Sequence, residues 1–327
     1  MQNDQYLINE LKKMLHWKES KAFYANRLGV SEHAISALLQ EIRGKKTLDD
    51  LYTYLPSEKG KIEIKVKSSA KILLLDIESS PLLVYVWQTQ VWKARIGHKQ
   101  VVSNWFAITW SAKWLDSDEV FSDRLTGEES LLEDDSRIVT SLWLLLDEAD
   151  IVIAHNGDTF DIPNINTRCV LHKLPPPSPY KQIDTLRVAQ QRFGFTHNSL
   201  DALAEFFGIE GKIQTDFQLW KDCIHGNEQA LFDMEEYNRN DVIVLEKIYH
   251  FLKPYMKGHP NLDLYNDTEN PVCPTCGKHT LSWMEGKYFY TQAVRYQIYR
   301  CTECGSISRA KKGEPYENKK TIMSIPR

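Results

Sequence analysis

Two carboxylates set one residue apart, directly behind an aliphatic run, constrain this chain more than any other feature. They are Asp76 and Glu78 in the stretch KILLLDIESS, Lys71 to Ser80. The aliphatic run predicts a strand buried on both faces, and strand residues two apart point to the same face. Burying an unpaired pair of carboxylates is costly. Because divalent cations remove that cost, the pattern predicts a metal site with further oxygen ligands elsewhere in the chain.

Two later stretches offer such ligands. In AHNGDTFDIP, Asp161 follows Phe160 at the start of a predicted helix. In EEYNRNDVIVLEKIY, Tyr237 and Asp241 are four residues apart, which places them on one face of a helix. Strands are predicted at residues 71–78, 105–115 and 150–156, and a helix at 136–149. This alternation indicates an α/β fold with a mixed sheet.

The same stretches, in this order, resemble a known set of motifs. D-x-E, N-x-x-x-F-D and Y-x-x-x-D are similar to the three exonuclease motifs of the DEDD, or DnaQ-like, superfamily. HNGDTFDIP resembles the second motif in the proofreading domain of family B DNA polymerases. IDTLRVAQQRFGFTHNSLDALAEFFGI resembles the stretch between the second and third motifs of proofreading exonucleases. The resemblance covers residues 70–255. The superfamily has two branches, one with a Tyr four residues before the last Asp and one with a His five residues before it. This chain has Tyr237 and, at the position of the His, Glu236, which is typical of the tyrosine branch.

The resemblance implies a fold and an activity. The fold would be a ribonuclease-H-like mixed sheet flanked by helices, over residues 67–257. The activity would be that of a 3′–5′ exonuclease, a hydrolase that cuts phosphodiester bonds at the 3′ end of DNA during replication or repair. The expected partners are nucleic acid with a free 3′ end and a replication or repair protein.

The resemblance also implies a role for each motif residue. Two Mg²⁺ or Mn²⁺ ions would activate a water and steady the leaving oxygen, held by four acids: Asp76, Glu78, Asp161 and Asp241. Tyr237 would orient that water. Asn156 and Phe160, which lie in the second motif, would contact the substrate.

Four cysteines in two C-x-x-C pairs predict a zinc ribbon at residues 268–327. They are Cys273, Cys276, Cys301 and Cys304. In a chain outside oxidising compartments this spacing is typical of one structural Zn²⁺ bound by four thiolates. The glycine after each pair, Gly277 or Gly305, suits the tight turn around a bound thiolate. The ribbon could contact nucleic acid or dock a protein, and the sequence leaves both open.

The other end of the chain has a helical pattern. Residues 1–50 include AFYANRLGVSEHAISALLQEIRGKK, in which a break at Gly29 and a cap at Ser31 resemble a helix-turn-helix. A module that only packs as helices fits the same pattern. Residues 258–270, rich in Asn and Asp, are expected to be a linker before the zinc ribbon.

The charges are distributed unevenly along the chain. Residues 1–46 carry 8 Lys or Arg against 5 Asp or Glu, and residues 271–327 carry 10 against 4. The middle of the chain, residues 47–270, carries 22 against 35. An acidic centre repels a polyanion unless cations occupy it or the basic ends do the holding.

The sequence excludes some classes and leaves others open. No apolar run reaches the roughly 18 residues that span a bilayer, and the polar start is no signal peptide, so a cytoplasmic protein without a membrane partner is expected. An exoribonuclease, a catalytically silent nucleic-acid-binding regulator or scaffold, and a structure-selective endonuclease remain alternatives. The strandedness of the substrate and the oligomeric state stay undetermined.

Overall fold

The computed structural model describes residues 69–87, 95–210, 213, 215–266 and 269–314. The predicted helix-turn-helix-like module, residues 1–50, lies outside this part of the chain. Within the described residues, no helix combines the length and the hydropathy that crossing a bilayer takes.

A mixed sheet of five strands forms the centre of the first described domain. Its order is β5-β4-β1-β6-β7. The strands are β1 Ile72–Ser79, β4 Ala107–Trp114, β5 Val120–Arg124, β6 Ile151–Ala154 and β7 Lys181–Asp184. β1 pairs antiparallel with β4 and parallel with β6. The predicted strand at residues 71–78 is therefore the central one, which explains its continuous aliphatic run.

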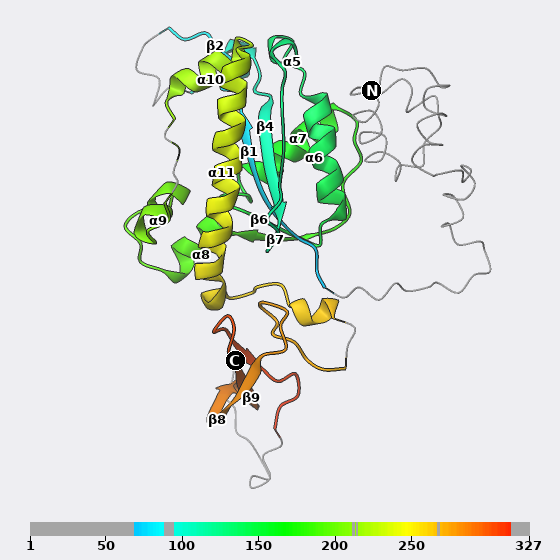
Figure 1. The fold of residues 1–327 in the computed structure, drawn as a ribbon, viewed down its shortest axis with the longest axis vertical. Coiled ribbons are helices and arrows are strands. Elements are labelled where there is room, and N and C mark those ends of the chain that lie inside the picture. The colour runs from blue at the N-terminus through cyan, green and yellow to red at the C-terminus, as the bar shows by residue number, and fades with distance from the viewer. Residues whose placement is uncertain (1–68, 88–94, 211–212, 214, 267–268, 315–327) are drawn as a thin grey trace, which may run out of the picture. The chain divides into compact units, whose positions relative to one another are not determined.

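Helices cover both faces of this sheet (Figure 1). The helices are α5 Gly127–Leu131, α6 Ser136–Glu148, α7 Asp161–Leu171, α8 Thr185–Arg192, α9 Leu200–Phe206, α10 Phe217–Ile224 and α11 Glu228–Leu252. α11 runs along one face, and α6 and α7 lie on the other (Figure 1). A small second sheet pairs β2 Leu83–Val84 with β3 Val101–Ser103, which follows the 3-10 helix η2 His98–Gln100. The expected mixed α/β sheet flanked by helices is confirmed.

The core on the α11 side is built from alternate residues of β1 and one stripe of the helix. Ile72 and Leu74 of β1 pack with Leu245 and Tyr249 of α11 in one buried cluster. Apolar residues at helical spacing along α11 produce this stripe. The same face of β1 continues to Asp76, so the packing brings the preceding turns of α11 to the acidic end of the strand.

The other face of β1 packs against α6 and α7. Ile77 lies opposite Trp110 of β4, and Trp110 is buried. The Trp110 indole nitrogen donates to the carbonyl of Ile138 in α6 at 2.7 Å. Trp87, by contrast, is fully exposed.

Polar side chains begin most of these helices. Each cap accepts a hydrogen bond from a backbone N–H that the helix itself leaves unsatisfied. The caps are Thr126 for α5, Asp184 for α8, Ser199 for α9, Asp216 for α10 and Asn227 for α11.

A cysteine-bearing module, residues 269–314, follows the five-stranded domain. Its sheet has the order β10-β9-β8, with strands β8 Leu281–Tyr290, β9 Arg295–Cys301 and β10 Ile307–Arg309. Two 3-10 helices precede it, η3 Lys253–Tyr255 and η4 Leu262–Tyr265. Both parts belong to one compact unit of the chain, Lys67–Arg327.

The linker prediction for residues 258–270 is wrong in its centre. Leu262 is buried and joins the core cluster under α11. Its backbone N–H donates to the carbonyl of Pro274 at 2.9 Å, and the N–H of Val272 donates to the Asp263 carboxylate at 2.9 Å. A few apolar side chains among polar neighbours are a weak sequence signal, and here Leu262 ties the segment to the core.

The packing of α11 predicts that substitutions of two nearby residues on this helix change the stability of the protein by different amounts. Leu245→Ala should cost roughly 2–5 kcal/mol of unfolding free energy, because it leaves a cavity between α11 and the sheet. Ile243 lies on the same helix and is 37 % exposed, so Ile243→Ala should cost less than about 1 kcal/mol of unfolding free energy. Urea unfolding measures both, and equal losses would contradict the assigned packing of α11.

Candidate active site

Three acids from two elements meet at the end of β1. Asp76 and Glu78 lie on the face of β1 that α11 covers, and Asp241 comes from α11. One carboxylate oxygen from each lies within 4.8 Å of the others. Residues 165 positions apart in the sequence therefore form a single acidic cluster.

Asp161 reaches the same strand from the side of β6. β1 and β6 pair only as far as Leu74 and Ile153, so β1 extends past its neighbour. Along this extension the N–H of Ile77 donates to Oδ1 of Asp161 at 3.2 Å. Asp161 is the first residue of α7 and only 1 % exposed. It touches the strand between the two β1 acids, while its carboxylate lies outside the set of three that share the 4.8 Å limit.

The turn from β6 to α7 holds Asp161 in this position. Asn156 adopts a positive φ of 70°, which is uncommon for a residue other than glycine. A Cβ on Gly157 would lie 2.5 Å from the Cβ of Ala154, so only glycine fits. The Asp184 carboxylate accepts from the N–H groups of Asn156 at 3.0 Å and Asp158 at 3.3 Å, and it also caps α8. One buried carboxylate thus fixes both the turn and the next helix.

The two predicted substrate contacts have different surroundings. The amide oxygen of Asn156 accepts from the Thr159 hydroxyl, so this side chain helps to close the turn. Phe160 is 39 % exposed directly before Asp161. An exposed ring beside a buried carboxylate is suited to stacking on a base or sugar.

On α11, the predicted Tyr237 and Asp241 share one face and interact. The Tyr237 hydroxyl hydrogen-bonds the Asp241 carboxylate. Burial and the nearby carboxylates of Asp241 and Glu78 raise the pKa of Tyr237 above its ordinary value. The phenol therefore stays protonated and acts as a hydrogen-bond donor.

Sequence reasoning missed two side chains that hold the acids. Asn238, which is fully buried, donates from its amide nitrogen to Oδ2 of Asp76. The Trp220 side chain of α10 hydrogen-bonds Glu78 and lies edge-on to Tyr237, with 6.3 Å between ring centroids. Asn238 adjoins the motif tyrosine and could have been found from helix geometry. No pattern in the sequence pointed to Trp220.

Burial holds the acids in an unfavourable electrostatic state. Burial, followed by repulsion from neighbouring carboxylates, raises the pKa of Asp76 well above its ordinary value. Burial, then the charges of Asp241 and Asp161, raises the pKa of Glu78 to about 8. Burial also raises the pKa of Asp161 to about 7, against the hydrogen bond from the Ile77 N–H. Among the described residues, no Lys or Arg forms an ion pair with Asp76 or Glu78.

This donor set fits a divalent cation. Carboxylate oxygens are the ligands that Mg²⁺ and Mn²⁺ prefer. The amide oxygen of Asn238, beside Asp76, is buried without a hydrogen-bond partner among the described residues. A cation would compensate the charges that the protein itself leaves unbalanced.

The four cysteines of the two C-x-x-C pairs form a second cluster. The sulfurs of Cys273 and Cys304 are 3.7 Å apart, and those of Cys276 and Cys301 are 3.6 Å apart. Tetrahedral zinc with Zn–S bonds of about 2.3 Å would separate its sulfurs by about 3.8 Å. Gly277 and Gly305 adopt positive φ values of 71° and 77°, as the turn after each pair requires.

Hydrogen bonds prepare one of these thiols for a metal. Burial raises the pKa of Cys301, but hydrogen bonds from the Cys304 N–H and the Thr280 hydroxyl outweigh it and lower the pKa to about 6. The cysteines outside the cluster, Cys169 and Cys223, are both buried and form no disulfide.

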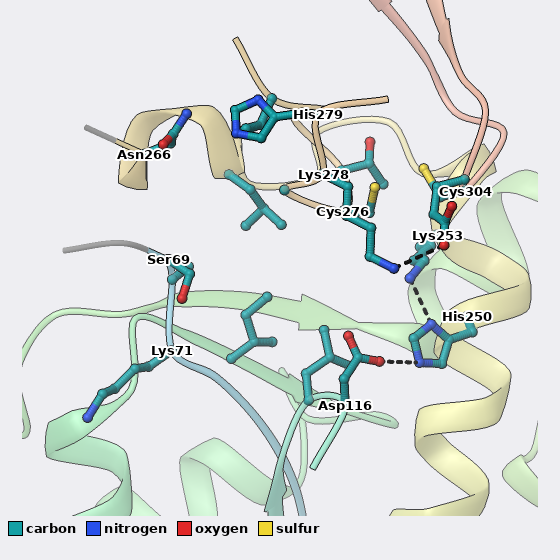
Figure 2. A pocket seen from close by; sticks show the side chains of 18 of the residues that line it. Ser69, Lys71, Asp116, His250, Lys253, Asn266, Cys276, Lys278, His279 and Cys304 are labelled. Atoms are coloured by element: carbon teal, nitrogen blue, oxygen red, sulfur yellow. Dashed lines mark hydrogen bonds and ion pairs between the residues drawn. The ribbon is translucent and has the colours of Figure 1, made fainter. Parts of the chain in front are cut away.

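A third group of potential ligands, Asp116, Glu246 and His250, lies beside a cavity of about 900 Å³. Figure 2 shows His250 between Asp116 and Lys253. Lys113 forms an ion pair with Glu246, and Lys253 contacts the His250 ring at 2.7 Å. These two lysines already balance the group, so its chemistry is that of an ion-pair network between α11 and the loop after β4.

The acidic cluster predicts how the stability of the protein depends on pH in buffer without Mg²⁺ or Mn²⁺. Folded Glu78 and Asp161 keep their protons up to pH values near 8 and 7, whereas unfolded carboxyls ionise near about pH 4. When folding raises the pKa of a carboxyl group, the contribution of that group to the stability of the folded state is fully present below its unfolded pKa. This contribution is lost as the pH rises through the folded pKa. The melting temperature should therefore fall between about pH 4 and pH 8.

A matched pair of variants isolates this effect. Asp76→Asn removes one buried charge and should raise the unfolding free energy at pH 8 by at least about 1 kcal/mol, with no gain at pH 4. Asp118→Asn, on the exposed surface, should change neither value. A destabilised Asp76→Asn protein at pH 8 would show that the cluster is not under electrostatic strain.

Comparisons with known proteins place this domain among known folds. A family model described as RNase_H superfamily matches residues 101–253. The family B DNA polymerase from the hyperthermophilic archaeon Pyrobaculum calidifontis is a similar solved structure, at 16 % sequence identity and a TM-score of 0.41. The alignment covers 57 % of this chain and 25 % of the polymerase, so it spans about a quarter of that protein. No curated protein matches. The mixed five-stranded sheet flanked by helices, together with this family match, gives the central domain a ribonuclease-H-like fold.

Proposed function

We propose that this protein is a metal-dependent nuclease that removes nucleotides from the 3′ end of DNA. One observation carries the proposal: Asp76, Glu78 and Asp241 converge at the end of the central strand, with Asp161 bound to the backbone between the first two. The match to the RNase_H superfamily supports a nuclease. The 3′–5′ direction follows from the resemblance of the three motifs to tyrosine-branch exonucleases.

The acids have the charge and spacing to hold divalent metal. Asp76, Glu78 and Asp241 would bind directly, and Asp161 would turn from the Ile77 N–H to complete the set. Two bound Mg²⁺ or Mn²⁺ ions supply a nucleophilic water and stabilise charge on the leaving oxygen. β1 is rigid and central, so it fixes the spacing of its two acids to the tolerance that in-line attack requires.

Other residues of the site would position the reactants. Tyr237 stays protonated, so its hydroxyl can orient a water by donating or accepting a hydrogen bond, but it does not act as a base. Asn238 and Trp220 hold Asp76 and Glu78 in one orientation. Phe160 would stack against the terminal nucleotide beside Asp161.

The cysteine cluster supports one structural Zn²⁺. Four thiolates leave no open coordination position, which is typical of a structural site. A three-stranded module with few buried apolar residues depends on such a metal to fold. Roles in replication or repair and a cytoplasmic location stay predictions from the sequence.

The proposed activity is tested on end-labelled oligonucleotides. With Mg²⁺ or Mn²⁺, the 5′-labelled strand should shorten as a ladder, and a 3′ label should be released at once as a mononucleotide. Asp76→Asn or Asp161→Asn should slow the reaction on the order of a thousandfold, because each removes a metal ligand. Tyr237→Phe should slow it roughly ten- to a hundredfold through misplacement of the water.

A neighbouring acid provides the control. Asp158 lies in the same turn but pairs with Arg187 at 2.9 Å, so Asp158→Asn should change the rate by no more than about twofold. RNA oligonucleotides of the same sequence decide between the DNA and RNA versions of the proposal. Cuts in a circular substrate would show an endonuclease instead, and activity retained by Asp76→Asn would refute the site.

The zinc proposal predicts a metal content. The purified protein should contain one zinc per chain, and Cys301→Ser should lose it together with the structure of the β8–β10 sheet. Cys169→Ala, a buried cysteine outside the cluster, should retain the zinc. Elemental analysis and hydrogen exchange over residues 269–314 measure both effects. A wild-type protein that folds normally without zinc would contradict this assignment.

A further inference from the structure

The sheet of the cysteine module has one face on which cations and aromatic rings gather. The pairing registers define it: Phe289 lies opposite Tyr296, Arg300 opposite Ile307, and Arg309 opposite Ile298. Because every second residue of a strand shares a face, these side chains point to one side of the sheet. We name this the arginine–aromatic face, made of Phe289, Tyr296, Ile298, Arg300, Ile307 and Arg309.

The Arg309 guanidinium contacts both rings on this face, and Phe289 and Arg309 are exposed. The Arg309 guanidinium carbon lies 4.2 Å from the centroid of the Tyr296 ring and 5.3 Å from that of Phe289. Phe289 is 48 % and Ile307 is 53 % exposed. Flat apolar groups capped by a cation provide a surface onto which bases can stack.

The positive charge of this face is not balanced by carboxylates. Among the described residues, no acidic side chain forms an ion pair with Arg300 or Arg309. Arg300 donates to the Gly305 carbonyl at 3.2 Å and otherwise faces solvent. Exposed Lys311 and Lys312 follow Arg309 along the chain. The face therefore offers two exposed arginines to an anionic partner, and two exposed lysines follow in the chain.

The opposite face of the same sheet differs. It also carries aromatic side chains, among them Tyr288 and Tyr290. Its cation, Arg295, lies over the Tyr288 ring at 4.4 Å and pairs with Glu314 at 3.0 Å. The charge of Arg295 is therefore balanced by a carboxylate, unlike the charges of Arg300 and Arg309.

We propose that the arginine–aromatic face binds a single strand of nucleic acid. Bases would stack on the Phe289 ring and on the Arg309 guanidinium that covers Tyr296, and phosphates would contact Arg300. Single strands present unpaired bases to such a surface, whereas a duplex hides them.

This inference deepens the proposed nuclease function. It rests on that function only in taking the bound strand to be the substrate. The central part of the chain, residues 47–270, carries 22 Lys or Arg against 35 Asp or Glu and repels a polyanion. A protein partner would be expected to bring carboxylates to the arginines. The aromatic rings on the same face as the arginines favour a nucleic acid instead, because its flat bases alternate with phosphates.

Binding by the full-length protein in the Asp76→Asn background tests the proposal, since this variant does not cut its ligand. Fluorescence anisotropy with labelled single-stranded DNA, single-stranded RNA and duplex DNA gives the affinities. Phe289→Ala and Arg300→Gln should each weaken single-strand binding on the order of tenfold. Arg300→Gln should also lower the slope of log affinity against log salt by about 0.7, as one lost phosphate contact does.

Two other residues of the cysteine module provide matched controls. Tyr290→Ala removes the ring next to Phe289, but on the opposite face. Lys278→Gln removes a cation of the same module that pairs with Glu303 at 3.0 Å. Both should bind like the parent protein. Zinc content and melting temperature check that every variant is folded.

Each outcome decides the proposal. Losses confined to Phe289→Ala and Arg300→Gln support it, and the DNA and RNA arms then tell which strand is held. Unchanged binding in both variants overturns it and leaves the face to a protein partner. Equal losses in the controls, or tighter binding of duplex than of single strands, overturn it as well. If wild-type protein binds strands at this face yet cuts none with Mg²⁺ or Mn²⁺, the nuclease proposal fails and the binding face stands.

Discussion

Unbalanced negative charge at the end of β1 is the constraint on which the rest of the structure depends. Burial and mutual repulsion raise the pKa values of Asp76, Glu78 and Asp161, and no Lys or Arg of the described residues pairs with the first two. Such an arrangement costs stability, so the surrounding fold has to hold it. The aliphatic half of β1 does so, because the α11 stripe that packs on Ile72 and Leu74 also fixes Asp241. The protein thus uses its core to keep acids together that would otherwise separate.

The sequence predicts most of this site because its signals are local. A buried strand with two acids on one face, and a tyrosine four residues before an aspartate on a helix, follow from the periods of strand and helix. The tight approach at Gly157, the hydrogen bond from Asn238 to Asp76 and the contact of Trp220 with Glu78 depend on how elements pack, which no local pattern encodes. Leu262 was missed for the same reason, since only the folded core shows which apolar residue of a polar segment docks there.

The distribution of charge differs between the two described parts. The five-stranded domain places carboxylates where metal would sit, and these carboxylates repel the phosphates of a substrate. The cysteine module carries exposed arginines and rings on one face of its sheet, where phosphates and bases can bind without opposing charge. The proposed cutting site and the proposed binding surface would therefore be built from separate chemistry within one compact unit.

The central claim is that four acids distant in sequence share divalent metal. Anomalous diffraction from crystals grown with Mn²⁺ tests it most directly, because the signal marks the metal itself. Two peaks about 4 Å apart, in contact with Asp76, Glu78, Asp161 and Asp241, would bear out the account. Crystals with no manganese at the end of β1, or with Asp161 directed away from every peak, would contradict it.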